Sequence, residues 1–184
     1  MNNKTDAEYK AILTHCRNLF EKKNADYGTA WRILRLSSLT DQIYIKAMRI
    51  RTIQEIGEQK VQDSVEGEFI GIINYCIMAI IQIQQKNEAR MNIPIVELMQ
   101  WYEKSFEETF ALCQEKNHDY GEAWRMMRVS SITDIILMKL LRIKEIEDNK
   151  GATLVSEGVE AGYKDMINYA IFALILADFK PKNH

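Results

Sequence analysis

Three carboxylates and an amide near the end of the chain have the types and spacing of a magnesium site: Glu157, Glu160, Asp165 and Asn168. At about 100° per residue, these side chains fall on one stripe of an otherwise apolar helix. Mg²⁺ prefers oxygen ligands of this kind and usually keeps waters and substrate phosphates as well. We therefore expect the three carboxylates to hold the metal and the amide to orient it for catalysis.

Two other interpretations of this stripe remain open. Asn168 and its counterpart Asn74 each lie inside an apolar run, where a buried amide needs hydrogen-bond partners. The two amides could bond each other or the backbone and so fix how the helices pair. The glutamates could instead belong to the solvated end of a surface helix. We expect both asparagines to be buried, each with a polar partner.

Two pairs of basic residues recur at a spacing of three on another predicted helix, Lys46 with Arg49 and Lys139 with Arg142. This spacing places both members of a pair on one helix face. Two cations beside a carboxylate stripe suit a polyphosphate. Lys139 and Arg142 would stabilise negative charge that develops in catalysis, and Lys46 and Arg49 would bind substrate. Alternatively, the basic side chains lie along a solvated face, as such pairs usually do.

The densest sequence match is an Asn-x-Asp-Tyr-Gly-x-Ala-Trp-Arg segment that occurs twice, from Asn24 and from Asn117. Its aromatic rings could stack on a nucleobase, its aspartates could accept from the base edge, and its arginines could reach phosphates through a planar fork. The expected substrate-binding residues are Asp26, Tyr27, Trp31, Arg32, Asp119, Tyr120, Trp124, Arg125 and Arg128. The structural alternative is that glycine ends a helix, aspartate turns the loop and tryptophan fills the end of a bundle.

The chain contains an internal sequence duplication. Residues 23–46 match residues 116–139 at an offset of 93, and a second match from Glu66 and Glu160 has an offset of 94. A period this long indicates a duplicated domain rather than a solenoid of short repeats. We predict two helical repeats, which we call repeat one and repeat two, at residues 1–90 and 95–184.

The two repeats are not equivalent on the polar stripe. Lys164 and Asp165 of repeat two are replaced by Ile70 and Gly71 in repeat one. Glu68 falls about 140° from the start of the stripe on the same helical wheel. Because repeat one lacks one carboxylate, we expect a single competent metal site, in repeat two.

Nearly the whole chain has helical character, with no strand-like alternation. Helices are predicted to start near Thr5, Ser38 and Ser64, then just after Pro94, and near Ser131 and Ser156. They are predicted to end near Asn24, Gly57, Gln85, Asn117, Asn149 and Phe179. Ser38 and Ser131 have the residue type of N-caps. We expect an all-α fold in which two bundles pack as a pseudo-twofold intramolecular dimer.

Composition excludes several classes of protein. Hydrophobic content of 47%, charged content of 27% and a net charge of −2 are typical of a soluble globular protein without a basic field for nucleic acid. The three cysteines lack metal or redox spacing, and the start lacks the apolar core of a signal peptide. The most apolar stretch, MINYAIFALILADF, is shorter than a membrane span. We expect a cytoplasmic protein with a nucleotide partner, and a homo-oligomer stays open.

These motifs resemble a known family. K-N-x-D-Y-G, then K-x-x-R, then E-x-x-x-x-D-x-x-N-Y is similar to bacterial and phage proteins classified as domain of unknown function 1599, also called nucleotide modification associated domain 1. Repeat two matches throughout, at Lys116 to Gly121, Lys139 to Arg142 and Glu160 to Tyr169. Repeat one matches at Lys23 to Gly28, Lys46 to Arg49, Glu66 and Asn74-Tyr75, and departs at Gly71.

More remotely, the chain resembles the all-α nucleoside triphosphate pyrophosphatases, which include MazG-like proteins. That resemblance implies Mg²⁺ held by E-x-x-E and E-x-x-D helices. Here asparagine replaces the last aspartate, and both acidic pairs lie on one helix. We expect a Mg²⁺-dependent (deoxy)nucleoside triphosphate pyrophosphohydrolase that acts mainly through repeat two. The alternative is a non-catalytic nucleotide-binding or regulatory helical module.

Overall fold

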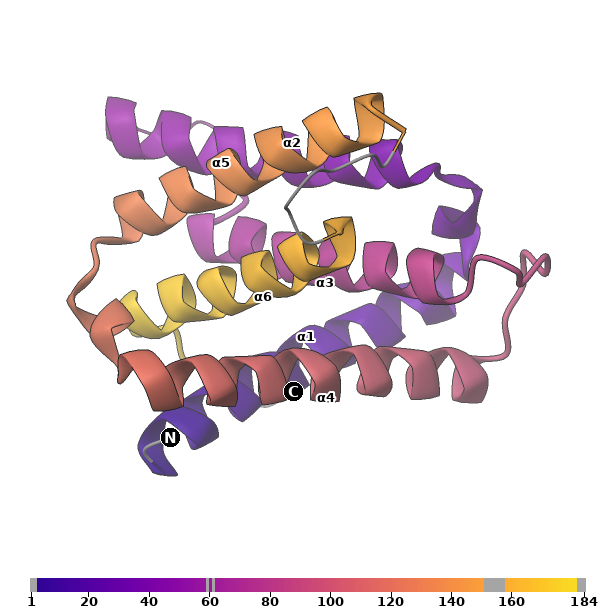
Figure 1. Cartoon of the computed structure of the whole chain (residues 1–184), viewed down its shortest axis with the longest axis horizontal. Coiled ribbons are helices and arrows are strands. Elements are labelled where there is room, and N and C mark those ends of the chain that lie inside the picture. The colour runs from indigo at the N-terminus through magenta and orange to yellow at the C-terminus, as the bar shows by residue number, and fades with distance from the viewer. Residues whose placement is uncertain (1–2, 59, 61, 151–157, 182–184) are drawn as a thin grey trace.

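The computed structural model describes residues 3–58, 60, 62–150 and 158–181. This part of the chain is built from helices alone, as predicted (Figure 1). Two 3₁₀ helices accompany six α-helices: α1 (Asn3–Tyr27), η1 (Ala30–Ile33), α2 (Leu36–Ile56), α3 (Val65–Gln84), α4 (Ile95–Tyr120), η2 (Ala123–Met126), α5 (Val129–Asp148) and α6 (Val159–Leu176). Figure 1 shows three layers, with α2 and α5 on one side, α3 and α6 in the middle, and α1 and α4 on the other side.

The predicted glycine stops are confirmed, whereas two predicted N-caps are wrong. Gly28 and Gly121 have φ values of +60° and +61° directly after α1 and α4, a conformation that glycine adopts without steric strain. Ser38 and Ser131 lie inside α2 and α5, which begin two residues earlier. The chain leaves each 3₁₀ helix in an extended conformation, and this bend fixes where the next helix starts. Ser156 lies outside the described residues.

The core lies between the two middle helices. α3 and α6 contribute aliphatic side chains that are fully buried, including Ile72, Ile73, Ile77, Ile167 and Ile171. By length and composition α3 could cross a membrane, but most of it is buried among the other helices. Because the two helices come from different repeats, the hydrophobic core belongs to both repeats together.

Buried hydrogen bonds between a tyrosine and an asparagine cross between the repeats at two corresponding places. Tyr102 donates to Asn74 Oδ1 at 2.9 Å, and Tyr9 donates to Asn168 Oδ1 at 2.5 Å. Burial raises the pKa of both tyrosines, so their hydroxyls stay protonated and donate. The asparagines are 7% and 5% exposed, which confirms that they are buried with polar partners. Each asparagine accepts a hydrogen bond from the first helix of the other repeat. The two pairs therefore fix the register of an arrangement in which the asparagine helix of each repeat packs against the first helix of the other.

The outer helices α2 and α5 form an antiparallel pair with matching contacts at both ends. Lys144 bonds Asp41 at 2.6 Å, and Arg51 lies 3.8 Å from Asp134 at the opposite end. The inner contacts repeat the same symmetry, because Gln54 donates to Thr133 at 3.1 Å and Thr40 donates to Glu147 Oε1 at 2.8 Å. These reciprocal contacts are the mark of a pseudo-twofold axis between α2 and α5.

Glu147 differs from its counterpart Gln54 in carrying a charge, and this difference predicts a pH effect. Burial raises the pKa of Glu147 above its ordinary value of 4.5. A carboxyl whose pKa is higher in the folded state stabilises the fold below its unfolded pKa, and this contribution is lost as pH rises through the folded pKa. Glu147→Gln should therefore raise the free energy of unfolding at pH 7 by about 0.5 kcal/mol, because the side chain is only partly buried.

Urea unfolding at pH 5 and pH 7 measures this effect. The gain should shrink at the lower pH, where Glu147 in the parent protein becomes protonated. Glu145→Gln, an exposed change on the same helix, is the matched control and should have no comparable effect. A Glu147→Gln protein less stable than its parent at pH 7 would contradict the interpretation.

Candidate functional site

Two pockets occupy corresponding places in the two repeats. The repeat-two pocket has a volume of about 360 Å³ and includes Lys116, Asn117, Tyr120, Trp124, Asp165 and Asn168. The repeat-one pocket has a volume of about 790 Å³ and includes the counterparts Lys23, Asn24, Tyr27, Trp31, Gly71 and Asn74. Each pocket lies where the C-terminal end of α1 or α4 meets a 3₁₀ helix and the middle helix of its own repeat. The duplicated motifs thus converge on two sites.

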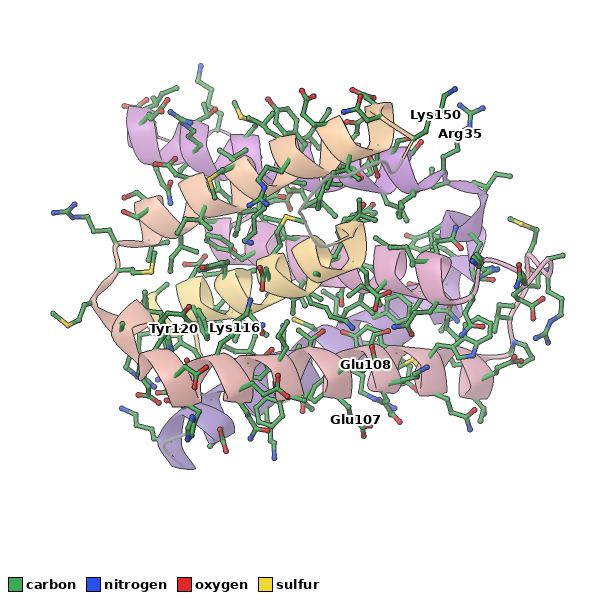
Figure 2. The ribbon with its side chains drawn as sticks, in the orientation of Figure 1. Arg35, Glu107, Glu108, Lys116, Tyr120 and Lys150 are labelled. Atoms are coloured by element: carbon green, nitrogen blue, oxygen red, sulfur yellow. The ribbon has the colours of Figure 1, made fainter. Side chains whose placement is uncertain are left out.

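The aromatic residues of each pocket divide into a rim and a wall. Tyr120 is 78% exposed, and Figure 2 shows it beside Lys116 at the C-terminal end of α4. Trp124 is 6% exposed and stacks on Phe172, with ring centroids 4.2 Å apart and ring planes 4° apart. The tryptophan therefore fills the bundle end, as the structural alternative holds, while the tyrosine ring remains open to stack on a ligand.

One carboxylate holds two lysines in repeat two. Lys116 donates to Asp165 Oδ1 at 2.5 Å, and Lys139 donates to Asp165 Oδ2 at 2.6 Å. The three residues come from α4, α5 and α6, so the cluster joins three helices beside the pocket. Two ammonium groups and one carboxylate leave one net positive charge. The cluster can therefore attract an anionic ligand.

In repeat one, Glu68 takes the part that Asp165 plays in repeat two. Lys46 donates to Glu68 Oε2 at 3.0 Å, and Arg49 donates to Glu68 Oε1 at 2.6 Å. Sequence reasoning missed this residue because a helical wheel placed it away from the stripe. Repeat one therefore has a carboxylate between its cations although Gly71 replaces Asp165, and the expectation of a single metal site, in repeat two, stays a prediction. The sequence did contain a signal for Glu68. Each repeat has one acid and one glycine at two corresponding positions, because Glu68 corresponds to Gly162 and Gly71 corresponds to Asp165.

Two residues that line the repeat-two pocket hold buried N–H groups without an acceptor among the described residues. These groups are Trp124 Nε1 and Asn168 Nδ2. In repeat one the amide is satisfied, since Asn74 Nδ2 donates to the Cys16 carbonyl at 3.2 Å. A buried donor without an acceptor costs about 1–3 kcal/mol. A ligand with acceptor atoms would remove this cost in repeat two.

The family described as nucleotide modification associated domain 1 matches two regions of the chain, residues 23–83 and 116–176. The chain belongs to this family. Each family domain runs from the last turns of α1 or α4 to α3 or α6, and so contains most of the residues that line one pocket. No curated protein and no solved structure matches the chain. The resemblance to MazG-like pyrophosphatases stays a prediction.

The expected metal ligands of the second family domain do not share one position. Glu160 accepts from Lys164 at 2.8 Å and from Gln84 at 3.0 Å, and Lys164 also bonds Glu108. Figure 2 shows Glu108 nearer the N-terminal end of α4 than Lys116, the residue that bonds Asp165. Ammonium groups thus occupy the oxygens that a metal would need. In the parts of the chain that are described, no three His, Cys, Asp or Glu side chains form a group that could hold a metal.

The described residues therefore do not fit a magnesium site. Glu157, the third expected ligand, lies outside them, so magnesium binding stays a prediction. Any such site would first have to release the ion pairs of Asp165 and Glu160. This would cost the charge-assisted hydrogen bonds that now neutralise both carboxylates.

Two arginines that the sequence suggested would bind phosphate instead make structural contacts that hold the family domains to neighbouring segments. Arg32 donates to the backbone carbonyls of Arg90 at 3.1 Å and Glu88 at 2.8 Å, and so anchors the connection between the repeats. Arg125 donates to Glu8 and Glu122, each at 2.8 Å, and joins η2 to the start of α1. Both guanidinium groups are committed to structural contacts. Their conservation between the repeats thus reflects the shared architecture.

The other expected residues lie at or outside the pocket rims. Tyr27 is 73% exposed and lines the repeat-one pocket, as its counterpart does in repeat two. Six further expected residues are not among those that line the two pockets: the exposed Asp26, Asp119, Arg128 and Arg142, and Arg49 and Lys139 of the cation clusters. Asp119 lies beside His118, with Oδ1 and Nδ1 3.1 Å apart. The site is therefore smaller than the sequence motifs suggested.

Proposed function

We propose that the repeat-two pocket binds a nucleoside monophosphate. The observation that carries this proposal is an open tyrosine ring at the rim of one cavity, buried N–H donors without acceptors on two of its lining residues, and a lysine cluster of which Lys116 and Asp165 line the cavity. A volume of about 360 Å³ falls within the range of pockets that hold small molecules. The lysine cluster suits the phosphate of a nucleotide, and the tyrosine ring and the N–H donors suit its base.

The lysine cluster suits one phosphate group. Lys116 and Lys139 with Asp165 carry one net positive charge. A phosphate monoester carries about −1.5 to −2 at neutral pH, so a monophosphate is the closest match in charge. A triphosphate would bring several further negative charges, which the described residues of this pocket do not balance.

The aromatic ring and the N–H donors of the pocket suit a nucleobase. Tyr120 presents its ring at the rim, where it can stack on a base. Trp124 Nε1 and Asn168 Nδ2 would donate to carbonyl or ring-nitrogen acceptors on the base edge. Guanine carries O6 and N7 as neighbouring acceptors, and thymine carries two carbonyl oxygens. The family description, which concerns nucleotide modification, agrees with a nucleotide ligand.

A Tyr120→Ala protein should bind monophosphates about 5- to 30-fold more weakly, because base stacking on an aromatic ring contributes roughly 1–2 kcal/mol. The apparent melting temperature without ligand should stay unchanged, since this ring is mostly exposed. Calorimetric titration with dGMP and dTMP measures affinity, after a thermal-shift screen of mono- and triphosphates with and without Mg²⁺. Met126→Ala, at a 90% exposed apolar residue of η2 outside the pocket, is the matched control.

The screen also tests the Mg²⁺-dependent pyrophosphohydrolase predicted from the sequence. Release of pyrophosphate from a deoxynucleoside triphosphate with Mg²⁺ would favour that enzyme over a binding module. Monophosphate binding that needs no metal is the result we expect. No stabilisation by any monophosphate would overturn the proposal. Cytoplasmic location and self-association stay predictions.

A further inference from the structure

We infer that the repeat-one pocket is a second nucleoside monophosphate site, in which Glu68 replaces Asp165 as the residue that positions the cations. This inference rests on the proposed function of repeat two. It contradicts the expectation that only repeat two is competent. The evidence is an exchange of acid and glycine between the repeats.

Gly71 leaves room for the altered path of Lys46. A Cβ atom at position 71 would lie 2.9 Å from both Cδ and Cε of Lys46, so this lysine passes directly over the glycine on its way to Glu68. In repeat two the corresponding residue is Asp165, and Lys139 ends on its carboxylate. The absence of a side chain at Gly71 is therefore matched to the acid three residues earlier.

The reverse substitution is present in repeat two. Gly162 is the counterpart of Glu68, and a Cβ atom there would lie 2.9 Å from Cδ1 of Ile143. Repeat two therefore has an aliphatic side chain where repeat one has its carboxylate. Each repeat keeps one acid, one glycine and the same lysine, with the acid moved by about one helical turn.

The exchange preserves the charge of the site. Lys46, Arg49 and Glu68 together carry one net positive charge, as the lysine cluster of repeat two does. Lys23, the counterpart of Lys116, lines the repeat-one pocket and has no ion-pair partner among the described residues. Its ammonium group can approach a phosphate without giving up an existing bond.

The base-binding end is also retained, with a different hydrogen-bonding pattern. Tyr27 lies open at the rim, and Trp31 Nε1 lacks an acceptor in the described structure. Asn24 Oδ1 is a buried acceptor without a donor there, whereas the repeat-two pocket has a second unmet donor. The two pockets should therefore bind a given base with different affinities.

Relocating the acid tests the inference. We expect dGMP or dTMP to occupy two sites per parent chain in calorimetric titration. Glu68→Gly should weaken the repeat-one site at least tenfold, and so should Gly71→Asp, because its side chain displaces Lys46. The double variant E68G/G71D recreates the arrangement of repeat two and should restore affinity to within about threefold of the parent. Glu68→Gln, which keeps the shape of the side chain, covers the case in which Glu68→Gly does not fold.

The outcomes separate this inference from the proposed function. One bound nucleotide per chain, with affinity reduced in Tyr120→Ala and unchanged in Tyr27→Ala, would overturn the second site and leave the repeat-two proposal standing. A double variant as weak as its single variants would show that Glu68 does not position the cations. No monophosphate binding by the parent protein would overturn both proposals. The repeat-two site should be unchanged in every variant of positions 68 and 71.

Discussion

A Lys139→Met protein should bind nucleoside monophosphate in repeat two at least about 30-fold more weakly than its parent. A hydrogen bond to a charged group contributes about 1.5–3 kcal/mol, and the change also removes the net positive charge of the cluster. Asp165 would keep its bond to Lys116, so the helix contacts around it survive. Methionine retains the length of the apolar stem, which limits the change to the charge.

Calorimetric titration with dGMP and dTMP gives the affinity, and circular dichroism confirms the fold. Lys144→Met is the matched control, because it removes a lysine from the same helix whose partner, Asp41, lies on the surface of α2. The control should bind both nucleotides as the parent does. Equal losses of nucleotide affinity in the two variants would mean that the overall charge of the protein causes the effect. The assignment of Lys139 to the site would then fail.

The second large effect concerns stability. Residues 1–90 expressed alone should not form a stable helical monomer. Without repeat two, the core side chains Ile72, Ile73 and Ile77 of α3 lose the helix that buries them. Exposing three such side chains costs roughly 5–9 kcal/mol, which is comparable to the whole stability of an ordinary domain.

The fragment can still reach a folded state by forming a homodimer. In a homodimer, Tyr9 of one copy would face Asn74 of the other, in the place that Tyr102 occupies in the full chain. Helicity should therefore depend on concentration, as measured by circular dichroism and light scattering across a dilution series. Adding a 91–184 fragment should produce a one-to-one complex. A helical monomer that persists on dilution would contradict a core shared between the repeats.

The sequence predicted the helices well because their signals are local. Apolar periodicity and the glycines at 28 and 121 act within a few residues of the structure they specify. The serine caps failed because the bend after each 3₁₀ helix, and not the identity of Ser38 or Ser131, determines where α2 and α5 begin. The burial of Asn168 followed from its apolar neighbours. Its partner did not, since Tyr9 is 159 residues away in the chain.

The site was predicted less completely, because contacts between helices decide what a charged residue does. Lys46 and Lys139 were identified from their spacing, but a helical wheel describes one helix and could not show that Glu68 faces a neighbouring one. Arg32 and Arg125 had the side-chain type that suits phosphate. Backbone carbonyls and glutamates from distant segments engage them instead. Only the packed structure reveals these competing partners.

The tyrosine–asparagine hydrogen bonds between the repeats also determine when folding can be completed during translation. α1 is synthesised before α6, so its buried face and Tyr9 lack this partner until α6 has emerged. Contacts between such distant segments form slowly, because the entropic cost of closing a long loop must be met before the contacts can stabilise the fold. The faces of α1 and α3 that pack on α6 are therefore exposed until α6 has been synthesised. Duplication within one chain ensures that the missing half arrives at high local concentration, attached to the half that needs it.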